Sequence, residues 1–179
     1  MHEKSGVTYS LDVCCDCKRG CCLESKPPLS KSRKKTISAY LKNKKIDIKD
    51  PFDKEGYSYP KLADSLFCVF LDKIGKCVVH PVKPETCVAG PITFDINFSS
   101  GKVEWFLKKS AICRYAGKLY CDKEAFKKHF DVAKEQLTRL IRELSPEELQ
   151  ILSKIPEPET FKIGEDDLPQ EVLKILEKK

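Results

Sequence analysis

The stretch CVFLDKIGKCVVHPVKPETCVAGP, residues 68–91, brings three cysteines close together in the middle of the chain. Two apolar segments, 66–71 and 76–80, flank residues 72–75, which end in a glycine. This pattern predicts a β-hairpin with the glycine in its turn. A single cysteine at a strand end is commonly a small buried apolar side chain. With Cys113 and Cys121 further on, however, this region holds five cysteines, which packing alone explains poorly.

A second group of cysteines lies near the start of the chain, in the stretch CCDCKRGCC, residues 14–22. Cys14 and Cys17 are separated by two residues, and such a loop can bind one metal ion because it folds back and offers backbone N–H groups to the sulfurs. The adjacent Cys21 and Cys22 point apart, which favours a multinuclear cluster or two neighbouring sites. Cys15 has no assigned role in this arrangement, and neither has Cys121.

Composition and length bear on the choice between metal sites and disulfides. The chain has 179 residues, of which 41% are hydrophobic and 34% charged, so it buries enough surface to fold without covalent cross-links. Its first residues lack the apolar segment of a secretory signal, and no stretch is long and apolar enough for a membrane span. We therefore expect a cytoplasmic protein with no membrane partner. Disulfides are rare in that compartment, so the ten cysteines indicate metal or redox chemistry, with disulfides as the alternative.

The basic residues are concentrated in residues 26–49, which hold nine lysine or arginine residues and one acid, Asp47. Pro27-Pro28 breaks the chain before a short helix that Ser30 or Ser32 caps, and Asp50-Pro51 ends this region. Residues 51–65 are expected to be a loop with one helical turn. A basic segment of this kind can bind a protein or nucleic-acid partner, although many such runs are only the solvated face of a helix.

The remaining pattern changes from strand-like to helical along the chain. Apolar residues alternate with polar ones over 92–98, and residues 103–107 return after a turn, which predicts a second hairpin. Apolar residues then recur every three or four positions over 123–144, which predicts a long helix packed through one stripe.

Two shorter helices are expected after that long one. Ser145-Pro146-Glu147-Glu148 is a capping box that begins a helix, and the proline-containing residues 155–158 end it. A last amphipathic helix carries Val172, Leu173, Ile175 and Leu176. The predicted fold class is α+β: a small β-rich cysteine-cluster core with flanking and C-terminal α-helices. Residues 1–122 would form the metal-binding domain, and residues 123–179 a helical segment packed on it.

Both cysteine stretches, taken together, resemble the YkgJ-type cysteine-cluster family, which is described as a zinc- or iron-chelating domain with the signature CxxCxxCC. The resemblance covers roughly residues 10–120. Its most specific part is the second stretch, where Cys68, Phe70, Leu71, Cys77, Lys83-Pro84, Cys87 and Pro91 stand at the family's positions. Cys113 fits the family's later cysteine, which follows a strand that here contains Trp105. Flagellin lysine N-methylase is a related protein in which such a domain is expected to carry an iron–sulfur cluster.

The resemblance implies a set of metal ligands, which would form two four-ligand sites or one iron–sulfur cluster and one zinc site. These ligands are Cys14, Cys17, Cys21, Cys22, Cys68, Cys77, Cys87 and Cys113. We favour an iron–sulfur cluster, most simply 4Fe-4S, because scattered cysteines suit a cluster held by several loops. Zinc is the alternative, since thiolates bind both. His80, in Cys77-x2-His80, is a further possible ligand.

The sequence assigns no catalytic residue. It contains no glycine-rich nucleotide-binding loop, no GxSxG and no HExxH. Whether the protein is an enzyme is therefore undetermined. Two classes of function remain: an iron–sulfur protein acting in redox chemistry or in modification of a macromolecule, and a zinc-stabilised interaction module whose basic segment binds the partner.

Overall fold

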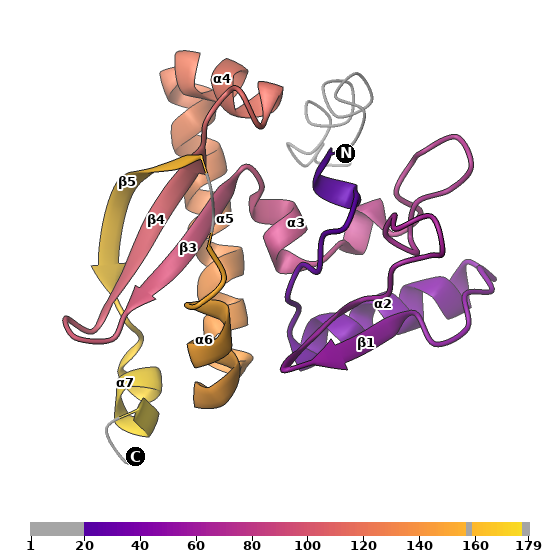
Figure 1. The fold of residues 1–179 in the computed structure, drawn as a ribbon, viewed down its shortest axis with the longest axis horizontal. Helices are drawn as coiled ribbons and strands as arrows, with labels where there is room; N and C mark the ends of the chain where they lie inside the picture. Colours follow the sequence, from indigo (N-terminus) through magenta and orange to yellow (C-terminus); the bar gives the residue numbers. More distant parts are fainter. Residues whose placement is uncertain (1–19, 157–158, 177–179) are drawn as a thin grey trace, which may run out of the picture.

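A computed structural model describes residues 20–156 and 159–176 of the chain. The fold is α+β, as predicted, with one three-stranded and one two-stranded antiparallel sheet among these residues. The larger sheet and the long helix behind it form one side of the molecule, and residues 20–84 form the other (Figure 1). We call residues 92–176 the sheet lobe and residues 20–84 the cysteine lobe, with a short helix between them.

The sheet lobe is built on β3 (Ile92–Asn97), β4 (Lys102–Lys108) and β5 (Thr160–Asp167), in the order β3-β4-β5. The hairpin of β3 and β4 confirms the second predicted hairpin. β5 follows the 155–158 break and was not predicted: its sequence, TFKIGEDD, ends in three acids and does not alternate as β3 does. β5 forms a strand because it pairs with the free edge of β4. A local sequence pattern cannot predict pairing with a strand that is distant in the sequence.

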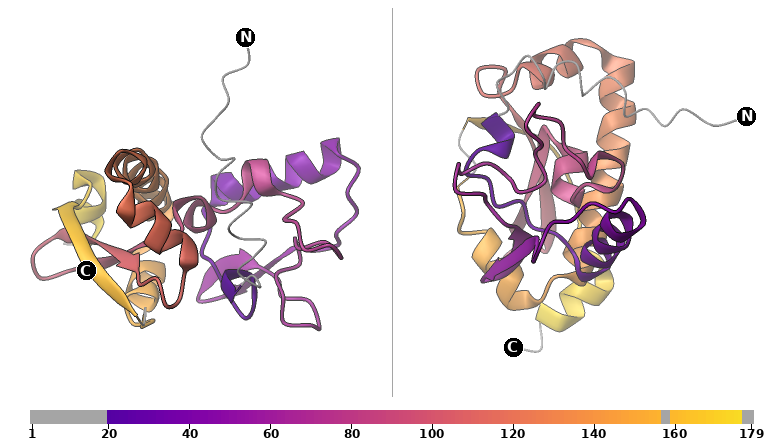
Figure 2. Two further views of the ribbon diagram at one scale, coloured as in Figure 1. Left: turned by 90° about the horizontal axis from the view of Figure 1, so that it is seen from above. Right: turned by 90° about the vertical axis from the view of Figure 1, so that its right-hand side faces the viewer.

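Helix α5 (Lys123–Glu143) covers one face of this sheet (Figure 2). Its apolar stripe is buried as predicted, with Ala133, Leu137, Leu140 and Ile141 fully inside. α6 (Pro146–Leu152) begins with the predicted capping box, in which Ser145 and Glu148 bond reciprocally to each other's backbone N–H. α7 (Gln170–Leu176) confirms the last predicted helix, whereas α4 (Arg114–Cys121) was not predicted.

The cysteine lobe contains α2 (Lys31–Asn43), whose N-cap is Ser30. Residues 51–65 were expected to form a loop, and that prediction is wrong. They contain a tight hairpin of β1 (Phe52–Glu55) and β2 (Tyr57–Pro60). Gly56 makes the turn with φ +79°, a value that other residues rarely adopt. An added Cβ there would lie 2.8 Å from the Ile151 side chain of α6, so the hairpin packs closely on that helix.

The predicted first hairpin, 66–71 with 76–80, is only partly present. The turn exists: the Asp72 N–H donates to the Lys76 carbonyl at 2.9 Å, and Gly75 has φ +75°. The flanking residues, however, form isolated bridges such as Leu71 with Cys77 rather than strands. The short helices η2 (His80–Val82) and α3 (Glu85–Ala89) follow. The strands are missing because residues 66–69 bond to other segments: the Val69 N–H donates to the Lys61 carbonyl, and the Glu24 N–H donates to the Leu66 carbonyl.

Each lobe has its own apolar core. The sheet lobe buries Trp105, Leu107 and the stripe of α5, and the cysteine lobe buries Leu29, Ile37, Phe70 and Val79. Leu152 packs partly buried against both cores. The predicted domain boundary at residue 122 falls between α4 and α5, both of which contribute to the larger core, and it stays a prediction. None of the described helices combines the length and apolar character needed to cross a bilayer.

Candidate metal centre

Five of the predicted ligands come together from three segments of the chain. Cys21 and Cys22 lie in the short helix η1 (Gly20–Cys22), Cys68 and Cys77 flank the 72–75 turn, and Cys87 lies in α3. The backbone holds two of these segments in register, because the Cys68 N–H donates to the Cys22 carbonyl at 2.8 Å. None of the five forms a disulfide.

The third segment, α3, is positioned by α2. Glu85, at the start of α3, is fully buried and accepts a hydrogen bond of 2.5 Å from the Ser30 hydroxyl. The Arg33 guanidinium lies 3.5 Å from the same carboxylate and donates to the Lys83 carbonyl at 3.0 Å. These contacts fix the backbone at residues 83–85, directly before Cys87. The sequence predicted Ser30 only as a helix cap. Its hydrogen bond to Glu85 could not be predicted from a local pattern, because the two residues are far apart in the sequence.

His129 of α5 holds the other end of α3. Its ring nitrogen Nε2 donates to the Ala89 carbonyl at 2.9 Å and lies 3.1 Å from the Gly90 carbonyl. Loss of water around the ring lowers the pKa of His129, so the imidazole is neutral at neutral pH and needs no counter-charge. Cys87 therefore lies on a helix that is fixed at both ends by groups from other elements.

Each of the five thiols interacts electrostatically with others of the set. Burial is the main cause that raises the pKa of Cys77 to about 11, and the neighbouring Cys68 and Cys21 charges add to it. Burial also raises the pKa of Cys87, with further contributions from Cys68, Cys77 and Cys21. Without a cation, these thiols stay protonated at neutral pH, because gathering their negative charges costs free energy. A bound metal ion removes that penalty and displaces the protons.

Cys21 and Cys22 were expected to point apart, but their sulfurs interact directly. The Cys22 thiol donates a hydrogen bond to the Cys21 sulfur, which lowers the pKa of Cys21 to about 6 and raises that of Cys22. The positive charges of Lys108, at the end of β4, and of Lys83 also lower the pKa of Cys21. The centre thus has one sulfur that is already anionic at neutral pH, with two lysines close enough to stabilise it.

Backbone N–H groups are also directed at the sulfurs. The Phe70 N–H donates to the Cys68 sulfur, and the Val79 N–H donates to the Cys77 sulfur, so both bonds span two residues. Donors of this kind stabilise thiolates and tune the metal that they hold.

The described residues supply thiol groups suited to a metal, but they do not form a complete coordination site. Within residues 20–156 and 159–176, no three His, Cys, Asp or Glu side chains are arranged to hold a metal ion. Cys14, Cys15 and Cys17 lie outside the described residues. Thiolates are the preferred ligands of both zinc and iron–sulfur clusters, so the chemistry of the gathered sulfurs fits either group.

The other candidate ligands occupy different positions. Cys113 is the residue before α4 and packs, half-buried, against the core of the sheet lobe. Cys121 is the last residue of α4 and is exposed. His80 begins η2, and its pKa is lowered by burial and by the charge of Lys83, which keeps the ring in the neutral form that binds metals.

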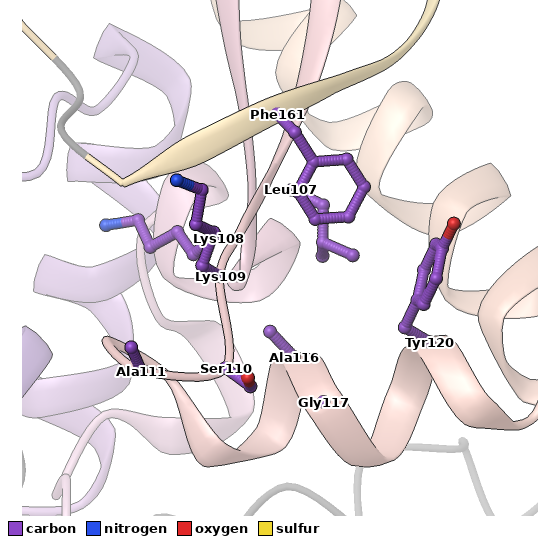
Figure 3. A pocket seen from close by; sticks show the side chains of 9 residues that line it. All are labelled: Leu107, Lys108, Lys109, Ser110, Ala111, Ala116, Gly117, Tyr120 and Phe161. Carbon is purple, nitrogen blue, oxygen red and sulfur yellow. The ribbon is translucent and has the colours of Figure 1, made fainter.

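A hollow of about 320 Å³ lies beside this region, between the end of β4, the start of β5 and α4. Figure 3 shows Lys108 and Lys109 on one side of it and the rings of Tyr120 and Phe161 on the other. The two rings meet edge to face with their centres 5.4 Å apart. Because Lys108 also acts on Cys21, this lysine links the hollow to the thiol cluster.

Comparison with known families finds a metal-chelating family that matches this chain. The family model described as "CxxCxxCC: Putative zinc- or iron-chelating domain" matches residues 13–114, more than half of the chain. The chain belongs to the CxxCxxCC family. Its membership confirms the resemblance that the two cysteine stretches carry and supports chelation of zinc or iron as their role. No curated protein and no solved structure matches the chain.

Proposed function

We propose that this CxxCxxCC domain binds an iron–sulfur cluster, of the 4Fe-4S type, and acts in redox chemistry or in modification of a macromolecule. The observation that supports it is the convergence of Cys21, Cys22, Cys68, Cys77 and Cys87 from three segments far apart in the sequence. A cluster held by several loops needs this arrangement, whereas most structural zinc sites use two compact CxxC pairs. Cys14, Cys17 and Cys113 complete the proposed ligand set.

The surrounding residues suit such a centre. A bound cluster supplies reversible one-electron transfer. Cys21 is exposed, so the centre would lie close enough to the surface to exchange electrons with a partner. Lys83 and Lys108 offset the negative charge of the thiolates, and the Phe70 and Val79 N–H groups bond to the sulfurs. Both effects favour the reduced form, because they stabilise added negative charge.

Metal analysis tests the proposal. The protein is purified without oxygen, its absorbance at about 400 nm is recorded, and iron, sulfide and zinc are counted per chain. We expect a brown protein with iron and sulfide in equal amounts. A colourless protein with stoichiometric zinc and no iron would refute the iron–sulfur assignment.

Single substitutions test the ligands. Cys17→Ser and Cys87→Ser remove sulfurs from different loops, and each is expected to lower both the metal content and the thermal stability. Cys121→Ser is the matched control, because that thiol is exposed at the end of α4. Wild-type metal content in Cys87→Ser, or an equal loss in Cys121→Ser, would show that the ligand set is wrong.

A zinc-stabilised interaction module is the second candidate. The N–H bonds at Cys68 and Cys77, each from the second residue after the cysteine, favour it because compact turns of this kind also hold structural zinc. In that case the metal contributes folding free energy only, and stoichiometric zinc without iron is the expected result of the same measurement.

A further inference from the structure

A row of lysines follows one side of α2. Lys34 and Lys35 follow Lys31 by three and four residues, and Lys42 follows Lys35 by seven. The four lysines therefore share a stripe that runs along most of this 13-residue helix. The stripe is next to the buried face formed by Ile37 and Leu41, which anchors the helix on the cysteine lobe. In Figures 1 and 2, α2 lies on the side of the molecule away from the large sheet.

These lysines lack the ion pairs that several lysines of the sheet lobe form. In the sheet lobe, Lys102 and Lys162 form ion pairs with carboxylates of β5 at 2.8 and 2.6 Å. Across the described part of the chain, by contrast, no carboxylate forms an ion pair with any lysine of the α2 stripe. An uncompensated row of positive charge attracts a polyanion, and it does so more strongly than isolated surface lysines.

The stripe also borders a hollow that contains an aromatic ring. Lys31, Lys34, Lys35, Ser38 and Phe52 line a space of about 520 Å³ between α2 and β1. The ammonium group of Lys34 lies 5.2 Å from the centre of the Phe52 ring. Three ammonium groups, one hydroxyl and one ring around a single hollow match the two parts of a nucleotide unit, a phosphate and a base. An acidic peptide would bind to the ammonium groups, but its carboxylates would make no stacking contact with the Phe52 ring.

We propose that the α2 stripe and the hollow at Phe52 bind single-stranded nucleic acid. The lysines contact successive phosphates along the helix, and Phe52 stacks on a base, the combination by which proteins bind single strands without reading their sequence. The binding is expected to depend on salt, because each phosphate contact releases counterions. This proposal does not rest on which metal the cysteines hold.

The test uses the full-length, metal-loaded protein and fluorescence anisotropy with a labelled oligothymidine of about 20 nucleotides. The first variant is the triple change Lys31→Gln, Lys35→Gln and Lys42→Gln. Glutamine has nearly the helix propensity of lysine, so α2 should stay folded. We expect at least a tenfold loss of affinity at about 50 mM salt, and a salt slope that is smaller by about 2.

The matched control is the triple change Lys118→Gln, Lys123→Gln and Lys127→Gln, which removes the same charge from exposed positions on α4 and α5. It is expected to change the affinity less than twofold. Phe52→Leu keeps an apolar side chain in the hollow and removes the stacking surface. It should cost about tenfold in affinity.

Three results would overturn the proposal. Equal losses in the two triple variants would show a response to net charge alone. Binding of poly-glutamate as tight as that of the oligonucleotide, together with an unaffected Phe52→Leu variant, would indicate a surface for an acidic protein. Binding that does not change between about 50 and 200 mM salt would exclude phosphate contacts as the main interaction.

Discussion

The two lobes order their backbones in different ways. The sheet lobe uses three paired strands and a helix of 21 residues, so most of its backbone groups bond within regular elements. The cysteine lobe uses α2, one short hairpin, isolated bridges and turns. In its turns, backbone N–H groups also bond to the sulfurs of Cys68 and Cys77.

This difference indicates where each lobe gets its stability. The sheet lobe is held by burial of apolar side chains that its own elements supply, such as Trp105 and Leu140. The cysteine lobe has a smaller core, and it gathers thiols whose negative charges would repel one another once their protons leave. We infer that the sheet lobe folds on its apolar core alone, whereas the cysteine lobe depends on its metal.

Removal of the metal should produce the largest effect. After chelation under reducing conditions, we expect amides of residues 66–89 to lose their protection from hydrogen exchange, because a bound structural metal contributes about 10 kcal/mol to folding. Amides of β3, β4 and α5 should keep most of theirs. Hydrogen exchange followed by mass spectrometry separates the two regions. Simultaneous loss of protection in both lobes would show that they are one cooperative unit.

Two core substitutions compare the lobes directly. Leu140→Ala and Ile37→Ala each empty a fully buried position, one in each core, and each is expected to cost about 2–5 kcal/mol in the free energy of unfolding. Leu140→Ala should leave the metal affinity unchanged, whereas Ile37→Ala should lower it. Denaturant unfolding and competition with a chelator measure the two quantities. A fall in metal affinity in Leu140→Ala would contradict the separation of the lobes.

Glu85→Gln should have the smallest effect of the three. Glutamine can still accept a hydrogen bond from Ser30, but it loses the ion pair with Arg33, so we expect a cost of about 2 kcal/mol and faster metal loss as α3 loosens. Glu143→Gln is the control, because Glu143 bonds to Ser32 nearby but is only half-buried. Its cost should be less than about 1 kcal/mol. Metal loss at equal rates in both variants would deny Glu85 a role in positioning Cys87.

Local sequence patterns predicted the sheet lobe better than the cysteine lobe. The alternation over 92–98, the stripe of 123–144 and the capping box at Ser145 all produced the elements that they predict. Each of these signals lies within the element itself. β5 and the β1–β2 hairpin were missed, because their order comes from pairing and from packing on α6. The pattern of 66–80 predicted a hairpin of two strands, but residues 66–69 bond to residues 22–24 and 61–63, which are distant in sequence from residues 76–80.

For the site, the amino-acid sequence by itself determined the chemistry: ten cysteines, two of their groupings and the family to which they belong. Only the tertiary structure decided which thiols share an environment, that Lys83 and Lys108 act on Cys21, and that Glu85 ties α3 to α2. It also showed that the α2 lysines border a hollow with Phe52. The physical reason is that the type of a ligand is a property of one residue, whereas charge, burial and geometry arise between residues that the folded backbone brings together.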